Sequence, residues 1–331
     1  MASFSKFGND LYTGARSFNI VGRRKIWYTI AIVLVSIAVI VPLARGSWVF
    51  GIDFTGGSEF RISDLSKPVE SLAAPAVDSV TPDVAPRVAL VGTDSIRVQT
   101  DQLTTKQTDE VRSALAKAYD VPLKQVSASF IGATWGADIT QTALRGLITF
   151  IILAAVVMAL YFRTWKMSVA ALVALIHDLV LTAGFYGLLG IEVTPAAVIG
   201  FLTILGYSLY DTVVVFDKIR ENTNEDGENS TRSFSQSVNL AVNQTLVRSI
   251  NTSIVAILPV GAILFIGSLL LGAGTLRDIS LALFVGIIVG TYSTIFIAAP
   301  LYSQLREGET DIKKREKKRT SSTRVTTGAV R

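Results

Sequence analysis

The chain alternates between long apolar runs and shorter polar connections, which is typical of a protein that crosses a membrane several times. Five runs are uncharged or nearly so and approach the ~20 residues that a helix needs to cross the bilayer hydrocarbon. These runs are Ile26–Leu43, Leu144–Phe162, Val193–Phe216, Ile254–Leu276 and Ile279–Leu305. A sixth run, Met167–Gly190, is apolar except for His177 and Asp178. The pattern predicts six transmembrane helices in a polytopic α-helical membrane protein.

Lysine and arginine lie in every second connection. They occupy the N-terminal tail (1–25), the turn at 163–166, the connection 217–253 and the C-terminal tail (307–331). Because basic segments remain in the cytoplasm, we expect both termini on the cytoplasmic side of the membrane. The predicted order after the tail is a transmembrane helix (26–43), an extracytoplasmic domain (44–139), and a five-helix bundle (140–306) with the cytoplasmic loop 217–253.

Three smaller expectations concern the ends of these segments. The first run follows basic residues as a signal peptide would, but its length and the absence of an A-x-A cleavage pattern favour an uncleaved anchor. Within the loop, Phe234–Ser249 has apolar residues at helical spacing, which indicates a helix on the membrane surface. The charged tail after Glu307 has few apolar residues and is predicted to be disordered.

The segment 44–139 has the mixed pattern of a small α+β domain. Strand-like segments are Ser58–Ser63, Val84–Val91, Ser95–Thr100 and Lys124–Ile131. Helical spacing is found in Val69–Val80 and in Thr104–Tyr119, where Thr104 or Thr105 suits the N-cap. The order strand–helix–strand–strand–helix–strand predicts a ferredoxin-like fold.

Composition excludes several kinds of chemistry. The chain has no cysteine and a single histidine, so disulfides, thiolate metal sites and histidine clusters are ruled out. We therefore expect no metal and no cofactor. A separate expectation is that the chain has no enzyme activity of its own. The net charge of +5 is modest, and membrane topology explains the basic residues better than a nucleic-acid partner does.

Asp211 is the most informative candidate residue, because it lies inside an apolar run. It is about six residues from the charged end of its span, or roughly 9 Å below the interface. An ionised carboxylate there is costly unless paired, and such residues mark ion or proton paths. Arg248, just before the fifth span, would lie at similar depth on the next helix. We expect an ion pair that protonation of Asp211 releases; the alternative is a static pair, with Arg248 reaching the headgroups.

The other polar residues in the spans are open to two interpretations. His177 and Asp178 lie about 16 Å into the third span, near its middle. They would form either a proton relay or a buried polar pair satisfied by neighbouring helices; since adjacent residues point about 100° apart, at most one is expected to line a given seam. Tyr207, Ser208 and Tyr210 flank Asp211 and would hydrate or hydrogen-bond it, or simply join helices.

The sequence GIDFTGG, which contains Gly51, Asp53, Gly56 and Gly57, begins the extracytoplasmic domain. Three glycines in seven residues predict a tight backbone turn. It is not a phosphate-binding loop, because the GK[ST] signature is missing.

Several of these motifs together resemble the SecF family of bacterial protein export. The matching segments are FGIDFTGG at 50–57, IGATWGADIT at 131–140, the pair His177–Asp178, GYSLYDTVVVFDKIREN at 206–222 and NQTLVRSINTS at 243–253. The resemblance covers nearly the whole chain apart from the two tails. One difference is Tyr210, where the family commonly has Asn.

The resemblance implies a function. SecF-like proteins belong to the resistance–nodulation–division superfamily, pair with SecD beside the SecYEG channel, and use the proton motive force to promote export of preproteins. Their functional carboxylate and arginine fall on Asp211 and Arg248. Contacts with secreted preprotein and membrane lipid are expected. The alternatives are a proton-coupled exporter of small molecules or lipids from the same superfamily, and a translocase scaffold that uses no ion gradient.

Overall fold

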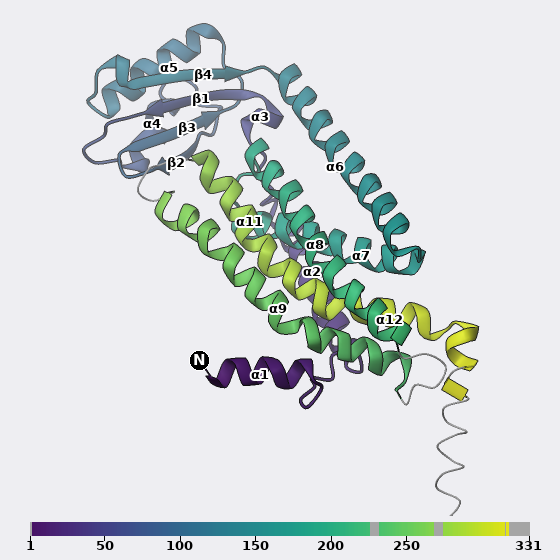
Figure 1. Cartoon of the computed structure of the whole chain (residues 1–331). Coiled ribbons are helices and arrows are strands. Elements are labelled where there is room, and N and C mark those ends of the chain that lie inside the picture. The colour runs from purple at the N-terminus through teal and green to yellow at the C-terminus, as the bar shows by residue number, and fades with distance from the viewer. Residues whose placement is uncertain (1, 226–231, 268–273, 315, 318–331) are drawn as a thin grey trace, which may run out of the picture.

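The computed structural model describes residues 2–225, 232–267, 274–314 and 316–317. A small sheet domain lies at one end of a bundle of long helices, while α1 (Ala2–Tyr12) lies at the opposite end (Figure 1). We refer to these as the sheet end and the terminal end of the bundle. The arrangement follows the predicted order of one helix, one α+β domain and a five-helix bundle.

Six helices within the described residues are long and apolar enough to cross a membrane. They are Arg24–Arg45, Ala133–Phe162, Trp165–Leu189, Pro195–Asn224, Phe234–Gly267 and Gly274–Glu307. Each overlaps one of the apolar runs, so the prediction of six spans is confirmed. Most of these helices begin or end beyond the apolar run, because neighbouring polar residues continue the helix.

The spans form a packed bundle in which the last two helices change geometry. The first four are α2 (Arg24–Arg45), α6 (Ala133–Phe162), α7 (Trp165–Leu189) and α8 (Pro195–Glu225). The fifth is α9 (Phe234–Ala262) with the π-helical segment η3 (Ile263–Gly267). The sixth is α11 (Gly274–Ser293), the π-helical segment η4 (Thr294–Ala298) and α12 (Ala299–Glu307). Such segments are rare and occur often at functional sites.

Small residues allow close contact between the spans. A Cβ added to Gly184 of α7 would lie 2.8 Å from the carbonyl oxygen of Ala38 on α2. On α11, a Cβ at Gly286 would overlap the side chain of Ile204 on α8. Close backbone approach at small residues is a general means of packing helices in membranes, where lipid removes much of the hydrophobic driving force.

The sheet domain has the predicted ferredoxin-like topology. Its elements are β1 (Gly57–Ile62), η1 (Glu70–Leu72), α4 (Ala73–Asp78), β2 (Arg87–Val91), β3 (Ser95–Thr100), α5 (Thr105–Ala118), η2 (Leu123–Gln125) and β4 (Val126–Ile131). The sheet order is β2-β3-β1-β4, with every neighbouring pair antiparallel. Alternate strand residues such as Phe60, Ile62 and Val98 meet Val111 and Leu115 of α5 in one apolar core.

The predicted N-cap of the second domain helix is also confirmed. Thr104 caps α5 and forms a capping box with Gln107, whose side chain accepts from the Thr104 backbone N–H. This reciprocal arrangement satisfies two backbone donors at the start of the helix.

The prediction of a separate surface helix at Phe234–Ser249 is wrong. Those residues are the first half of α9, which continues without interruption into the fifth span. Ser233 caps this helix with Gln236 in a second capping box. Most of the predicted loop 217–253 is therefore the ends of α8 and α9, and residues 226–231 lie outside the described residues.

The predicted disorder of the C-terminal tail is wrong for its first residues. Residues 310–314 are helical, and Ile312 is buried. Glu309 accepts hydrogen bonds from Arg306 and forms an ion pair with Lys166, with Nζ and Oε1 2.9 Å apart. Together these contacts hold the segment against α7 and α12. Residue 315 and residues 318–331 lie outside the described part of the chain.

Candidate functional site

Polar side chains gather in the interior of the bundle, on four of its helices. They are buried on α7 (His177, Asp178, Thr182), α8 (Ser208, Asp211, Thr212), α9 (Ser249, Ser253) and the junction of α11 and η4 (Ser293, Thr294). Polar groups at such depth face the bundle interior because lipid offers them no hydrogen-bond partner. The cluster is the candidate functional site.

Among the described residues, only one of the two carboxylate oxygens of Asp211 has a hydrogen-bond partner. Its side chain is 6% exposed, and Ser249 Oγ on α9 donates a hydrogen bond to its Oδ1 at 2.8 Å. Its Oδ2 is buried and has no hydrogen-bond partner among the described residues. Buried polar atoms are rarely left without a partner, so this oxygen is suited to hold a proton, a water molecule or a cation.

Arg248 does not pair with Asp211 in the described structure. Its side chain is exposed, and no ion pair joins it to Asp211 among the described residues. The expected ion pair is therefore absent. Adjacent helical residues point about 100° apart, and the residue of α9 that faces Asp211 is Ser249. Sequence fixes depth along a helix but leaves its rotation open.

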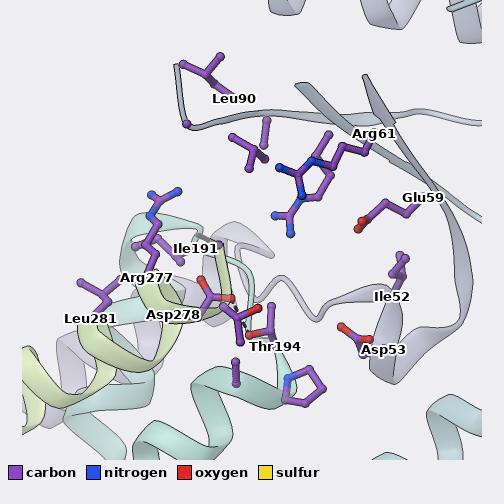
Figure 2. Close-up of a pocket in the computed structure, with 18 of the residues that line it drawn as sticks. Ile52, Asp53, Glu59, Arg61, Leu90, Ile191, Thr194, Arg277, Asp278 and Leu281 are labelled. Atoms are coloured by element: carbon purple, nitrogen blue, oxygen red, sulfur yellow. Dashed lines mark hydrogen bonds between the residues drawn. The ribbon is translucent and has the colours of Figure 1, made fainter. Parts of the chain in front are cut away.

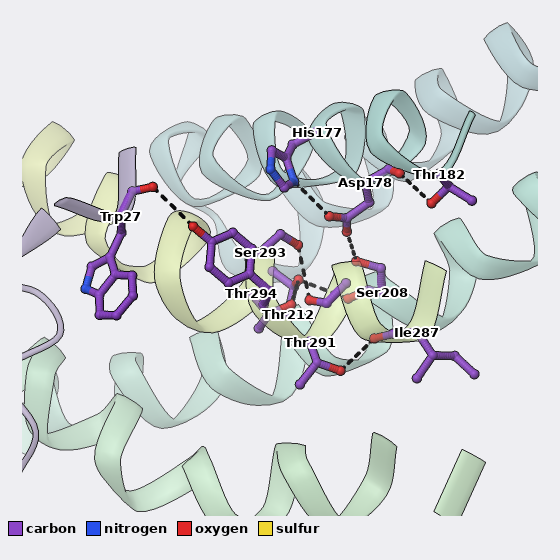
Figure 3. Close-up of polar contacts among 12 residues, drawn as sticks. Trp27, His177, Asp178, Thr182, Ser208, Thr212, Ile287, Thr291, Ser293 and Thr294 are labelled. Carbon is purple, nitrogen blue, oxygen red and sulfur yellow. Dashed lines mark hydrogen bonds and ion pairs between the residues drawn. The ribbon is translucent and has the colours of Figure 1, made fainter. Parts of the chain in front are cut away.

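His177 and Asp178 lie side by side and contact each other (Figure 3). His177 Nδ1 is 3.2 Å from Asp178 Oδ1, and Ser208 Oγ of α8 donates to Asp178 Oδ2 at 2.5 Å. Both residues thus take part in one site, against the expectation that at most one would line a given seam. His177 Nε2 is buried without a hydrogen-bond partner among the described residues.

The three polar residues expected around Asp211 are distributed differently. Ser208 serves Asp178, as described above. Tyr210 is 57% exposed and points away from the bundle interior, so its bulk does not shape the surroundings of Asp211 in this structure. The Tyr207 hydroxyl is buried and has no hydrogen-bond partner in the described residues.

Sequence reasoning missed the contribution of α11. Thr291 Oγ1 lies within hydrogen-bond distance of Ser253 on α9. In η4, which follows α11, Thr294 Oγ1 is 2.9 Å from Thr212 Oγ1 on α8 (Figure 3). Gly290 lies beside Asp178, since a Cβ placed there would be 3.5 Å from Asp178 Oδ2. A usable signal was present: GTYST at 290–294 is a run of small and hydroxyl residues within an apolar span.

The GIDFTGG motif joins the sheet domain to the bundle. Ile52–Thr55 forms the short helix α3, and Gly56 has φ of 77°, as the predicted tight turn requires. A Cβ at Gly57 would be 2.6 Å from the carbonyl oxygen of Thr100 on β3. The N–H of Gly51 donates to the carbonyl of Val193 at 2.9 Å. The glycines therefore permit backbone contacts that a side chain would prevent.

An open cleft of about 870 Å³ lies between the sheet and the sheet end of the bundle (Figure 2). Asp53, Glu59, Arg61, Arg277 and Asp278 are among the charged groups that line it. Asp53 is the one charged residue of the GIDFTGG motif. Burial raises its pKa, and the charge of Glu59 adds to the effect.

An ion pair beside this cleft connects the two parts of the protein. Arg97 Nη2 of β3 lies 2.8 Å from Glu192 Oε2 in the turn between α7 and α8. Burial raises the pKa of Glu192, although the charge of Arg97 opposes that rise. The pair fixes the open face of the sheet to the sheet end of the bundle.

These features define a multi-pass membrane protein with ionisable groups inside its helix bundle and an α+β domain at one end. The family model described as protein export membrane protein SecD/SecF, C-terminal, matches residues 110–308. The chain belongs to the SecF family of protein translocase subunits.

Individual relatives agree with this membership. The SecF subunit of Streptomyces coelicolor is 43% identical over 319 residues, which cover 96% of this chain and 84% of that relative. The SecDF subunit of Thermus thermophilus is 31% identical over 86% of this chain. The crystal structure of a Thermus SecDF, described as a translocon-associated membrane protein, superimposes with a TM-score of 0.75 at 29% identity over 88% of this chain. This chain spans 39% of that longer protein.

Proposed function

We propose that this chain promotes translocation of preproteins across the plasma membrane as an accessory subunit of the Sec machinery, drawing on the proton motive force. Family membership supports the translocation role. The observation that carries the energetic part is Asp211, a buried carboxylate with one oxygen unpartnered among the described residues. Ionisable groups at such positions in membrane proteins are costly and are retained on ion and proton paths.

A SecD subunit is the proposed obligate partner. In the Thermus relative the two names are joined in one chain, of which this chain matches 38%. Arg248 and Tyr210 are exposed on spans of the bundle, where lipid would solvate a guanidinium poorly. A partner subunit that covers this face would bury them. SecYEG, the preprotein and membrane lipid are further proposed contacts, with both termini in the cytoplasm and the sheet domain outside.

The proposed step is a change of charge inside the bundle. When Asp211 takes up a proton on its free oxygen, it becomes neutral, and its attraction for nearby cationic groups, Arg248 included, is lost. Helices that were held by that charge then shift, and the shift moves the sheet domain through the Arg97–Glu192 contact. One elementary charge crossing the membrane field supplies about 2.3 kcal/mol per 100 mV. That amount biases a conformational equilibrium, so repeated cycles would be required, and no covalent chemistry by this chain is proposed.

The test is Asp211→Asn in cells whose only copy of the subunit is the variant, assembled with SecD. We expect preprotein export to fall to the rate measured when an uncoupler removes the proton gradient, and to be insensitive to that uncoupler. Asp217→Asn is the matched control, because Asp217 is an exposed carboxylate on the same helix. It should export at the wild-type rate.

Other outcomes identify other functions. If Asp211→Asn and Arg248→Met both export normally while the complex assembles, the energetic role is wrong and a scaffold remains. If export is unchanged and tolerance to toxic compounds is lost, the protein is an exporter of small molecules.

A further inference from the structure

The bundle contains a second buried carboxylate, Asp178 of α7, which lies against α8 one turn away from Asp211. We propose that His177 and Asp178 form a second proton-binding site, in which the imidazole transfers a proton between its unpartnered Nε2 and the Asp178 carboxylate. This inference rests on the proposed proton-coupled function. It adds a site for the same cation, at a different seam of the bundle.

Burial and hydrogen bonding make Asp178 suited to this role. Its side chain is fully buried and that of His177 is 8% exposed. Each carboxylate oxygen has one partner: His177 Nδ1 at 3.2 Å and Ser208 Oγ at 2.5 Å. In the described part of the chain, the only ion pair of Asp178 is with His177. Among the described residues no lysine or arginine pairs with Asp178, so a carboxylate at this position has no permanent cation to balance its charge in the membrane interior.

Among the described residues, the groups that contact the pair from α8 and α11 carry no permanent charge. From α8 comes the Ser208 hydroxyl, and from α11 come the backbone of Gly290 and the ring of Tyr292, whose centroid is 6.1 Å from that of His177. The Tyr292 hydroxyl is itself engaged, since it donates to the carbonyl of Trp27 on α2. His177 is therefore the titratable partner through which a proton reaches Asp178.

The imidazole has the right connectivity for transfer. One nitrogen faces Asp178, and the other, Nε2, is buried and unpartnered among the described residues. Starting from an imidazole that carries its proton on Nδ1, a proton binds at Nε2 to give imidazolium. The Nδ1 proton then passes to Asp178 Oδ1, leaving a neutral imidazole protonated on Nε2 and a neutral carboxylic acid. One proton has entered, and the net charge of the pair rises from −1 to 0.

The second site is mechanically linked to the first through α8. Ser208, which contacts Asp178, and Asp211, which contacts Ser249 of α9, lie three residues apart on that helix. They therefore face neighbouring seams. Helix α11 borders both, through Gly290 at Asp178 and through Thr291 at Ser253. A displacement of α8 along α11 changes the contacts of both carboxylates at once.

A static polar contact between helices is the competing explanation, and carbodiimide labelling distinguishes the two. Dicyclohexylcarbodiimide reacts with protonated carboxyl groups in apolar surroundings. Membranes that contain the wild-type chain with its SecD partner are labelled over a range of pH, and modified peptides are quantified by mass spectrometry. A titrating Asp178 should lose labelling by about tenfold per pH unit on the alkaline side of its transition. Labelling that is absent, or that does not change with pH, overturns the inference.

A variant provides a second test. Asp178→Asn keeps the shape and an acceptor oxygen for Ser208 but cannot bind a proton, so a static contact would tolerate it. We expect loss of uncoupler-sensitive export with normal assembly; normal export overturns the inference. His177→Gln should slow the response of Asp178 labelling to a pH jump, whereas Asp217→Asn should leave it unchanged.

The two proposals can fail separately. Labelling of Asp211 with none at Asp178 removes the second site and leaves the proposed function standing. Normal export by Asp178→Asn together with lost export by Asp211→Asn removes the second site alone, whereas normal export by Asp211→Asn removes the proposed function.

Discussion

The sheet domain and the helix bundle bury opposite kinds of side chain. The domain core is apolar, built from residues such as Phe60, Val98 and Leu115. The bundle interior instead holds Asp178 and Asp211 beside serine and threonine hydroxyls, while large apolar side chains cover much of its outside. Each part exposes the groups that its surroundings solvate. The sheet domain exposes polar groups to water, and the bundle exposes apolar groups to lipid.

The comparison shows why charge has different meanings in the two parts. In the sheet domain, ion pairs such as Lys106–Glu110 are exposed and contribute little to stability. In the bundle, lipid cannot solvate a carboxylate, so an ionised carboxylate is costly there unless a partner compensates it. In the proposed function, energy from an ion gradient would therefore act at the bundle, and the sheet domain would follow.

The largest effect expected from breaking this pattern is in the domain core. Leu115→Ala removes a fully buried side chain and should lower the free energy of unfolding of the sheet domain by about 2–5 kcal/mol. Resistance of the domain to protease in membranes that contain the full chain measures this. Lys117→Ala, at an exposed position of the same helix, should change it by less than about 0.5 kcal/mol. Equal effects of the two substitutions would contradict the assigned core.

In the bundle, a comparable effect comes from adding volume. Gly184→Ala places a Cβ 2.4 Å from Ala38 Cβ and 2.8 Å from its carbonyl oxygen, so α2 and α7 must separate at a cost of about 1–3 kcal/mol. Thermal inactivation in detergent should occur at a lower temperature. Gly206→Ala meets nothing within 4 Å and should be neutral or slightly stabilising. A Gly184 variant as stable as the wild type would show that the two helices do not pack so closely.

A smaller effect is expected from pH at the sheet end. Burial raises the pKa of Glu192 above its ordinary 4.5. The folded state thus binds this proton more tightly than the unfolded state, and the stabilisation is complete below pH 4.5 and lost as pH rises through the raised value. The melting temperature should therefore fall over that window. The melting temperature of Glu192→Gln, whose side chain is always neutral, should fall less over the same window. A pH slope equal to that of the wild type would contradict the raised pKa of Glu192.

The smallest effect is expected at the terminal end, with the opposite sign. Burial alone would raise the pKa of Glu309, but hydrogen bonds from Arg306 and Lys166 outweigh it and lower the pKa below 4.5. The stabilisation is present above pH 4.5 and lost as pH falls through the lowered value. Because the pair is partly exposed, its contribution should stay below about 1 kcal/mol. Near neutral pH, the Glu309→Gln variant should be less stable than the wild type, and this difference in stability should disappear in acid. A difference that persists in acid would contradict this contact.

The sequence was sufficient to predict features that follow from the pattern of apolar and polar residues along the chain. The six spans, the ferredoxin-like order and the N-cap at Thr104 all follow from apolar periodicity and local backbone chemistry. The position of Asp211 inside a long apolar helix was likewise readable, since it depends only on counting residues along the chain.

Features that depend on rotation and on distant contacts were not readable. Sequence placed Arg248 at the depth of Asp211, but the rotation of α9 turns Ser249 toward it instead. The contact of His177 with Asp178 depends on rotamers that bring neighbouring side chains together. The ordered start of the C-terminal tail depends on Lys166, more than a hundred residues away.

The most direct measurement of the central claim is proton movement itself. The purified chain with its SecD partner is placed in liposomes that enclose a pH-sensitive dye, and a pH difference is imposed across the membrane. We expect the wild-type complex to discharge this difference faster than protein-free liposomes, and Asp211→Asn to match the protein-free rate. Discharge by Asp211→Asn at the wild-type rate would show that this carboxylate carries no protons and would contradict the account.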